Sequence, residues 1–161
     1  MRLVDVPRRD GTLAQRELVV HPGAVVVVAL TADGEIVMIR NWRFAVGAEL
    51  WELPAGTLEA GEEPVDCARR ELAEETGFRP EVIEPLGEFF TTPGICTERM
   101  YAYVARELTE VGQSLDPGEQ IRAECLPVAR VREMMLSGEI VDAKTIAAMG
   151  LYLLGGDDSR R

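Results

Sequence analysis

The stretch from Gly56 to Phe78, GTLEAGEEPVDCARRELAEETGF, constrains the fold most, because it predicts a short helix with clear borders. Pro64 fits the first turn of a helix, and Gly77 fits the position just past its end. Between these borders three apolar residues recur at helical spacing: Val65, Ala68 and Leu72. The sequence therefore predicts a helix from about Pro64 to Gly77 with one buried face.

Acidic residues gather on another face of this predicted helix. Glu71, Glu74 and Glu75 are spaced i, i+3 and i+4 in its last turn and a half. Each carboxylate there costs about 0.3 to 1 kcal/mol against the helix dipole, and Arg69 and Arg70 offset only part of this. Such a local conflict is typical of a functional site. A hard divalent cation such as Mg²⁺ or Mn²⁺ would relieve it, because carboxylate oxygens suit these ions.

Length and charge limit the classes of partner. The chain has 161 residues, enough for one domain with a sizeable core. Its formal charge of −11 and pI near 4.6 argue against nucleic acid and anionic membranes as partners. An acidic protein that binds an anionic ligand needs metal ions and a few placed arginines.

The cysteines and the amino terminus bear on location. Cys67, Cys96 and Cys125 are odd in number and lack paired spacing, which is typical of reduced thiols. The amino terminus has no signal-peptide pattern, and no apolar run approaches about 18 residues. We expect a soluble, cytoplasmic protein.

The order of elements predicts an α+β fold with helices packed on a mixed sheet. Residues 1–20, with an Asp10-Gly11 turn, predict an antiparallel β arm. Residues 24–30 predict a strand buried on both faces, which forms a second hairpin with 35–40. The other expected elements are a loop at 41–48, strands at 50–53, 82–91, 100–105 and 121–126, a loop at 114–119, and helices at 127–136 and 142–154, the last from the apolar spacing of Ile146, Met149, Tyr152 and Leu153. The main domain would span 21–156, followed by a polar tail at 157–161.

Read with its spacing, the opening stretch is Gly56, five residues, Glu62, seven residues, and then RELAEETGF from Arg70 to Phe78. This resembles, without a departure, the signature of the Nudix hydrolases, G-x5-E-x7-R-E-U-x-E-E-x-G-U with U apolar. Seven fixed residues should meet by chance in fewer than about one in a million chains of this length. The resemblance implies a mixed β-sheet between helices, in an α/β/α arrangement.

We call this signature, at Gly56–Phe78, the Nudix box. Motifs outside the box resemble the ADP-ribose pyrophosphatase branch of that family. They are WELPAG at 51–56 with the preceding Arg43, TTPGICTER at 91–99 and DAKTIAAMGLYLL at 142–154. Thr92 stands where many relatives have serine, and the segment before His21 is shorter than in several members. In this branch an amino-terminal arm, often from the partner subunit of a dimer, helps to bind the base and its ribose. The resemblance therefore implies a homodimer.

The resemblance also implies two to three Mg²⁺ or Mn²⁺ ions. Glu71 and Glu75 would bind them, with Glu74, Glu119 and the backbone carbonyl of Ala55 as further ligands. A diphosphate repels a nucleophile, so cations must neutralise it and orient a water molecule. Arg70 is expected to pair with Glu62 or another acid rather than with substrate.

Several residues are open to two interpretations. For the general base we favour Glu119 over Glu74, yet Glu119 is as easily a solvated loop acid beside Asp116. Arg43 is the best candidate for a phosphate ligand. The resemblance implies further substrate contacts at Glu52, Gly94 and Glu98. Arg16 and Glu17, on the arm, are weaker candidates for such a contact. His21 is expected to be structural, while Trp42, Phe44 and Trp51 either stack on a base or pack beside the strands.

Three functions fit these residues. The first is hydrolysis of the diphosphate bond of ADP-ribose or a related nucleoside diphosphate sugar to a nucleoside monophosphate and a sugar phosphate, that is, an enzyme acting on acid anhydrides in phosphorus-containing compounds. The second is a broader pyrophosphohydrolase of nucleotide sugars or dinucleotides. The third is a non-catalytic ADP-ribose-sensing module, which would be expected to have lost some acids of the box, whereas Glu62, Glu71, Glu74 and Glu75 are all present.

Overall fold

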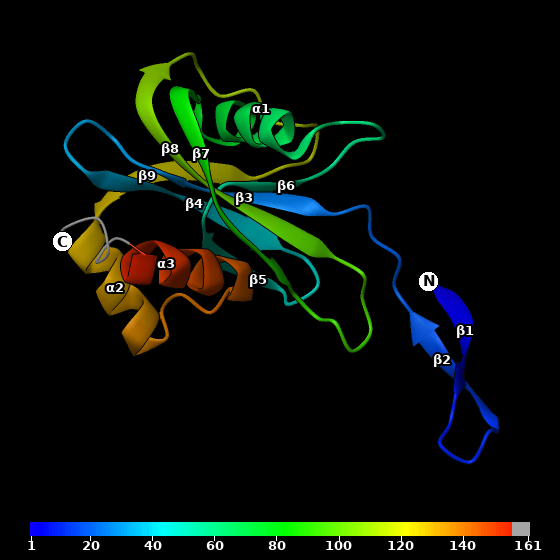
Figure 1. The fold of residues 1–161 in the computed structure, drawn as a ribbon. Helices are drawn as coiled ribbons and strands as arrows, with labels where there is room; N and C mark the ends of the chain where they lie inside the picture. Colours follow the sequence, from blue (N-terminus) through cyan, green and yellow to red (C-terminus); the bar gives the residue numbers. More distant parts are fainter. Residues whose placement is uncertain (156–161) are drawn as a thin grey trace.

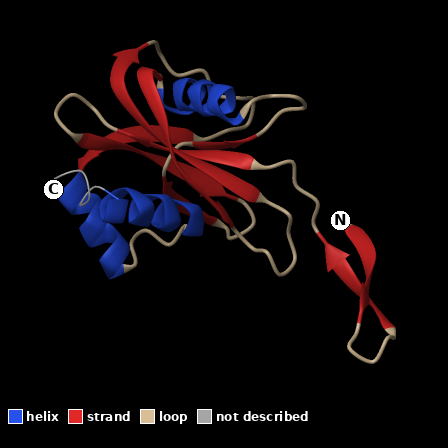
Figure 2. Ribbon diagram, viewed as in Figure 1, coloured by secondary structure: helices blue, strands red, loops and turns tan. Residues whose placement is uncertain are grey.

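The computed structural model describes residues 1–155, so the predicted polar tail at 157–161 lies outside the described residues. Helix α1 covers one side of the strands, α2 and α3 cover the other, and the β1–β2 hairpin projects from the body (Figures 1 and 2). This confirms the predicted α+β fold with strands between helices. In chain order the elements are β1 (Arg2–Pro7), β2 (Leu13–Leu18), β3 (Ala24–Ala29), β4 (Glu35–Arg43), β5 (Ala48–Glu52), β6 (Ala55–Thr57), α1 (Pro64–Thr76), β7 (Phe78–Phe90), β8 (Arg99–Glu110), β9 (Ile121–Pro127), α2 (Val128–Ser137) and α3 (Ala143–Gly155).

Strand β3 lies at the centre of the fold. It pairs with β6 antiparallel and with β8 parallel, in a mixed sheet of order β6-β3-β8-β7, while β5-β4-β9 form a second, antiparallel sheet. Its six residues are all buried, as predicted. Because side chains alternate along a strand, Val26 and Val28 join the core under α2 and α3, whereas Val25 and Val27 join the core under α1.

Helix α1 has the predicted borders and buried face. Ala68 and Leu72 are fully buried, and the half-buried Val65 packs on the same core. Gly77 ends the helix with φ of 77°, and its N–H donates to the carbonyl of Ala73 at 2.9 Å. The chain turns directly into β7, so the carboxyl end of α1 is fixed to the sheet.

Three strand predictions were incomplete. Strand β4 continues through Arg43 because its last residues pair with β5, which reduces the predicted loop to a turn. Strand β6 has three residues, too few for a sequence pattern. The Asp33-Gly34 turn exists, but β3 and β4 lie in different sheets and meet only at the Leu30–Ile36 bridge. The edges of both strands are occupied by other partners, so the predicted hairpin does not form.

The apolar stripe of α3 also differs from the prediction. Only Ile146 departs from it, at 39% exposed, whereas Met149 is buried and Tyr152 and Leu153 pack against the core as predicted. Thr145 and Ala148 are further buried positions of the helix. Thr145 and Ala148 share the buried side of the helix with Met149, and Ile146 lies outside it. All three cysteines lie in the described part of the chain, and none forms a disulfide. No helix within residues 1–155 is long and apolar enough to cross a membrane.

Candidate active site

Two adjoining cavities lie beside β6, with volumes of about 370 and 350 Å³. Four residues line both: Arg43, Ala55, Gly56 and Thr57. We call the smaller one the acidic cavity, because six carboxylates line it: Glu59, Glu71, Glu74, Glu75, Asp116 and Glu119. The other, here the second cavity, extends from Thr91 and Glu98 to the start of α3. Together they form one continuous site with an acidic and a mixed half.

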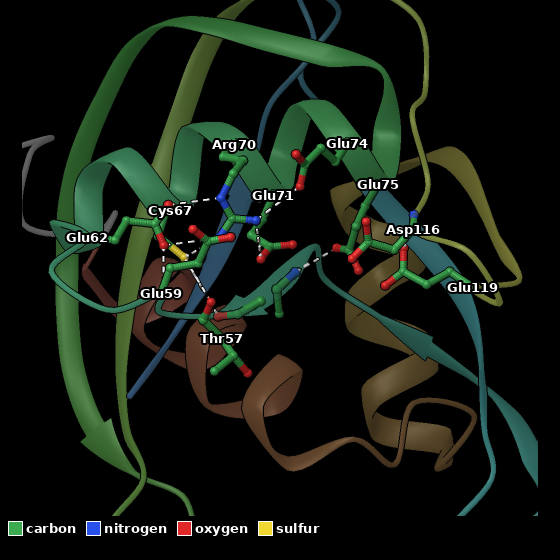
Figure 3. Close-up of polar contacts among 12 residues, drawn as sticks. Thr57, Glu59, Glu62, Cys67, Arg70, Glu71, Glu74, Glu75, Asp116 and Glu119 are labelled. Atoms are coloured by element: carbon green, nitrogen blue, oxygen red, sulfur yellow. Dashed lines mark hydrogen bonds and ion pairs between the residues drawn. The ribbon is translucent and has the colours of Figure 1, made fainter. Parts of the chain in front are cut away.

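The acidic cavity brings together residues that are far apart in the sequence. Glu71, Glu74 and Glu75 come from α1, whereas Glu119 comes from the loop before β9 (Figure 3). Ala55, in β6, also lines the cavity, and its N–H donates to Glu75 Oε2 at 2.9 Å. All the predicted metal ligands therefore line one cavity.

Arg70 neutralises part of this acidic group. Its Nε donates to Glu62 Oε1 at 2.9 Å, which confirms the predicted pairing of Arg70 with Glu62. Its Nη1 donates to Glu71 Oε1 at 2.8 Å and to Glu74 Oε2 at 3.0 Å. The Arg70 guanidinium lowers the pKa of Glu62 to about 2. One arginine thus serves three carboxylates, which leaves the cavity strongly negative.

Glu75 has the largest carboxyl perturbation of the site. Its side chain is 4% exposed, and burial raises its pKa to about 8. The neighbouring charges of Glu71 and Glu119 raise it further, although the Ala55 N–H opposes them. Burial also raises the pKa of Glu71. These carboxylates therefore cannot all ionise cheaply unless a cation joins them.

The second cavity contains a chain of ion pairs. Arg43 donates from Nε to Glu52 Oε1 at 2.7 Å and from Nη2 to Glu52 Oε2. Lys144 donates to the same Oε2 and lies 3.0 Å from Asp142 Oδ1. Glu52 is fully buried behind these cations. The hydrogen bond from Arg43 to Glu52 raises the pKa of Arg43, so this guanidinium is permanently charged.

Residues 20–149 match the NUDIX domain. The chain belongs to the Nudix family. An ADP-ribose pyrophosphatase of Bacillus subtilis is 37% identical over 147 residues, 90% of this chain and 80% of that protein. One of Mycobacterium tuberculosis is 39% identical over 152 residues, 92% of this chain and 73% of that protein. A GDP-mannose pyrophosphatase of Salmonella typhimurium is 30% identical over 155 residues, covering 88% and 80%.

A solved structure described as an ADP compounds hydrolase shares the fold. It superposes with a TM-score of 0.82 at 22% identity, over 96% of this chain and 85% of that chain. The NUDIX domain match over residues 20–149 and the relatives at 37% and 39% identity confirm the Nudix hydrolase assignment predicted from residues 56–78.

The Nudix box fits a divalent cation by its donor chemistry. Its candidate ligands are oxygens only, their negative charge is in excess, and among residues 1–155 neither imidazole nor thiolate lines the acidic cavity. Within residues 1–155, however, no three acidic, histidine or cysteine side chains converge closely enough to make a ready-formed metal site. Glu71 and Glu74 point to Arg70 instead. Cation binding would therefore require Glu71 to exchange Arg70 for the ion.

Gly56→Ala is expected to lower kcat by about 10²-fold without unfolding the Nudix domain. A Cβ at Gly56 would lie 1.8 Å from Glu71 Cδ, so Glu71 would have to move away from the metal side. Gly56 has ordinary strand backbone, so alanine adds no φ strain. Steady-state kinetics with Mg²⁺ measure the effect. Gly150→Ala on α3, where a Cβ meets nothing within 4 Å, is the control, and equal kcat values for the two variants would contradict the close fit of Glu71.

In the presence of a chelator, stability is expected to fall as pH rises from about 5 to about 8.5. The pKa of Glu75 is about 8 in the folded chain against an ordinary 4.5, so the folded state binds this proton more tightly. The stabilisation is complete below the ordinary pKa and is lost as pH passes the raised one. Glu75→Gln should remove on the order of 2 kcal/mol of this dependence, roughly 4 to 8 °C in Tm. Circular dichroism melts of the wild type and of Glu75→Gln measure Tm across this pH range. The same dependence of Tm on pH in both proteins would contradict the role of Glu75.

The remaining predicted contacts are distributed unevenly. Glu98 lines the second cavity, accepts a hydrogen bond from Thr91 Oγ1 and lies 3.5 Å from His21 Nε2. Gly94 is exposed in the β7–β8 loop and is absent from the lining of both cavities. Its role in binding stays a prediction, as does that of Arg16 and Glu17, which lie on the projecting arm.

The aromatic side chains have different surroundings. Trp51 packs against the core and under the guanidinium of Arg40, 5.1 Å from the ring centroid. Trp42 and Phe44 are 51% and 89% exposed near the β4–β5 turn. Packing therefore accounts for Trp51, whereas the other two remain free to contact a partner or ligand.

The sequence analysis did not single out Lys144 or Asp142 as site residues. Asp142 Oδ2 accepts the N–H of Thr145 at 2.9 Å, so it caps α3. Thr145 Oγ1 in turn accepts the N–H of Leu53 at 2.9 Å, which ties α3 to the end of β5. An aspartate before an apolar run was a usable signal for the cap. Lys144 is the only lysine in the chain, which was a usable signal for an unusual position.

Proposed function

We propose that the protein hydrolyses the diphosphate bond of ADP-ribose or a related nucleoside diphosphate sugar, releasing a nucleoside monophosphate and a sugar phosphate. The observation that carries the proposal is the junction of the two cavities at Arg43. A diphosphate placed there would have the carboxylates of α1 on one side and the mixed second cavity, with room for a sugar, on the other. The printed activities of the relatives, ADP-ribose and GDP-mannose pyrophosphatases, support the same class of substrate.

The residues divide the chemistry between them. Glu71 and Glu75, with Glu74 and the Ala55 carbonyl, would hold Mg²⁺ or Mn²⁺, with two to three ions as the expected number. Bound cations would supply charge neutralisation and acidify a water molecule. Arg43 would donate to a phosphate oxygen, since its exposed N–H groups line both cavities. Glu119 would accept the proton of the attacking water, and Glu98 would contact the terminal ribose.

A metal-dependent screen with product identification tests the proposal. ADP-ribose, GDP-mannose, other nucleotide sugars and dinucleotides are incubated with Mg²⁺, Mn²⁺ or a chelator, and the products are separated by chromatography. The expected result is AMP and ribose 5-phosphate from ADP-ribose, with no turnover in the chelator. Similar rates across the panel would instead favour the broader pyrophosphohydrolase. Tight ADP-ribose binding without any turnover would identify a sensing module and contradict the proposal.

We also propose a homodimer in the cytoplasm. An isolated two-stranded hairpin is marginally stable, and the β1–β2 arm exposes several apolar side chains: Met1, Leu3, Val6 and Leu13. A partner subunit that covers them would place the arm against a second domain. The three unpaired cysteines fit a reducing compartment. Analytical ultracentrifugation of the full chain tests the dimer, and a monomer at micromolar concentration would contradict it.

A further inference from the structure

The buried carboxylate of Glu52 joins two cations on different elements. Glu52 ends β5 and has no exposed side-chain surface. Arg43 of β4 binds both of its oxygens, and Lys144 of α3 binds Oε2. A carboxylate removed from water is stable only when its oxygens are fully paired. Glu52 is therefore a fixed anchor whose geometry depends on both cations.

Lys144 is itself held from a second side. Its Nζ lies 3.0 Å from Asp142 Oδ1, and its side chain is 15% exposed. Asp142 is committed to the cap of α3, and Thr145 ties that helix to Leu53 beside Glu52. The position of the Lys144 ammonium is thus set by the fold rather than by the flexible side chain alone. It bonds to the same oxygen of Glu52 as Arg43 Nη2 does.

Arg43, by contrast, is partly free. Its side chain is 42% exposed, and it lines both cavities at their junction. One edge of its guanidinium is bound to Glu52, while Nη1 and the second N–H of Nη2 have no partner among the hydrogen bonds of residues 1–155. The direction of these donors depends on where the Glu52 carboxylate lies. Loss of Lys144 would leave that carboxylate with Arg43 as its only cation among residues 1–155.

We propose that Lys144 is a positioning residue: by holding buried Glu52 from the α3 side, it orients the Arg43 guanidinium toward the diphosphate. The inference rests on the proposed function, because it needs a diphosphate at the cavity junction. Lys144 acts through Glu52 and does not contact the phosphates. It therefore sets the affinity for substrate rather than the chemical step.

The composition of the chain supports a specific need for lysine here. Every other basic side chain apart from His21 is arginine, and lysine occurs only at 144. Lysine presents a compact ammonium with three donors, whereas arginine presents a planar fork. The Lys144 ammonium meets two carboxylates that belong to different elements, Glu52 and Asp142. A single tetrahedral nitrogen can satisfy both at one point.

A double-mutant cycle tests the proposal by binding and by kinetics. The ligand is an ADP-ribose analogue with a methylene group in place of the oxygen that bridges the two phosphates. Its Kd is measured by calorimetric titration into the protein in the presence of Mg²⁺. Lys144→Met should raise the Kd about tenfold in the wild-type background but less than about twofold in Arg43→Ala, because coupled residues are not additive. With hydrolysable substrate, KM should rise by a similar factor while kcat stays within about threefold. Lys144→Gln, which keeps a donor but loses the charge, provides a second variant if Lys144→Met folds poorly.

Arg130→Met is the matched control, since it removes a cation from exposed ion pairs with Glu133 of α2 and with Glu139, which follows that helix. It should leave both Kd and KM unchanged. Additive effects of Lys144→Met and Arg43→Ala, or an unchanged Kd in Lys144→Met, would overturn the proposal. A wild type that binds the analogue but hydrolyses no diphosphate would refute the proposed function while the cycle on binding still decides the role of Lys144. Failure of the wild type to bind would refute both.

Discussion

Replacing Glu75 by glutamine is expected to abolish metal-dependent hydrolysis, with kcat/KM reduced by about 10⁴-fold. Glu75 is 4% exposed at the centre of the acidic cavity. An amide there keeps the volume but loses the charge that a cation requires. Stopped assays with ADP-ribose and Mg²⁺ measure the loss.

The folded state of Glu75→Gln should be as stable as the wild type in a chelator, or more so, because glutamine avoids the cost of burying a carboxyl group that ionises in the unfolded chain. Asp66→Asn is the control, since Asp66 is exposed on the same helix and should leave turnover unchanged. A fully active Glu75→Gln would refute the metal role of the box and, with it, the proposed function.

Glu119→Gln is expected to lower kcat by about 10³-fold with little change in KM, as removal of a general base does. Glu119 lines the acidic cavity together with Glu75, and its charge raises the pKa of that residue. The side chain is therefore close to the carboxylates of α1, although its loop is exposed. Glu74→Gln, the rival assignment, should lower kcat by about tenfold only.

Single-turnover kinetics of both variants, with Mg²⁺ saturating, separate chemistry from binding. A loss of less than about threefold in Glu119→Gln would mean that Glu119 is a solvated loop acid. A larger loss in Glu74→Gln would transfer the base to α1.

Elements with a strong local pattern were predictable. The run of apolar residues predicts the buried strand β3. The spacing of apolar residues, with Pro64 and Gly77 at the borders, predicts the helix α1. Elements defined by pairing were not. Strand β6 exists because Ala55 and Gly56 pair with β3, and the end of β4 exists because it pairs with β5. Neither has a residue pattern that distinguishes it from a loop.

The residues of the site also divide into those that the sequence predicts and those that it does not. The acids of α1 were found from their spacing, because helical geometry fixes which side chains share a face. Lys144 was missed, because its role depends on the packing of α3 against the end of β5, where a lysine and a buried glutamate meet.

The sequence by itself determined the Nudix box, its cluster of acidic side chains and the class of fold, since these depend on contacts within one helix and on periodicity along the chain. The tertiary structure alone decided that Glu119 faces Glu75 and that Arg43 lies at the junction of two cavities. It also showed that Arg70 holds Glu71 and that Glu52 is shared by two cations. The reason is physical: distances between side chains on separate elements are set by how those elements pack, and local sequence does not encode those distances.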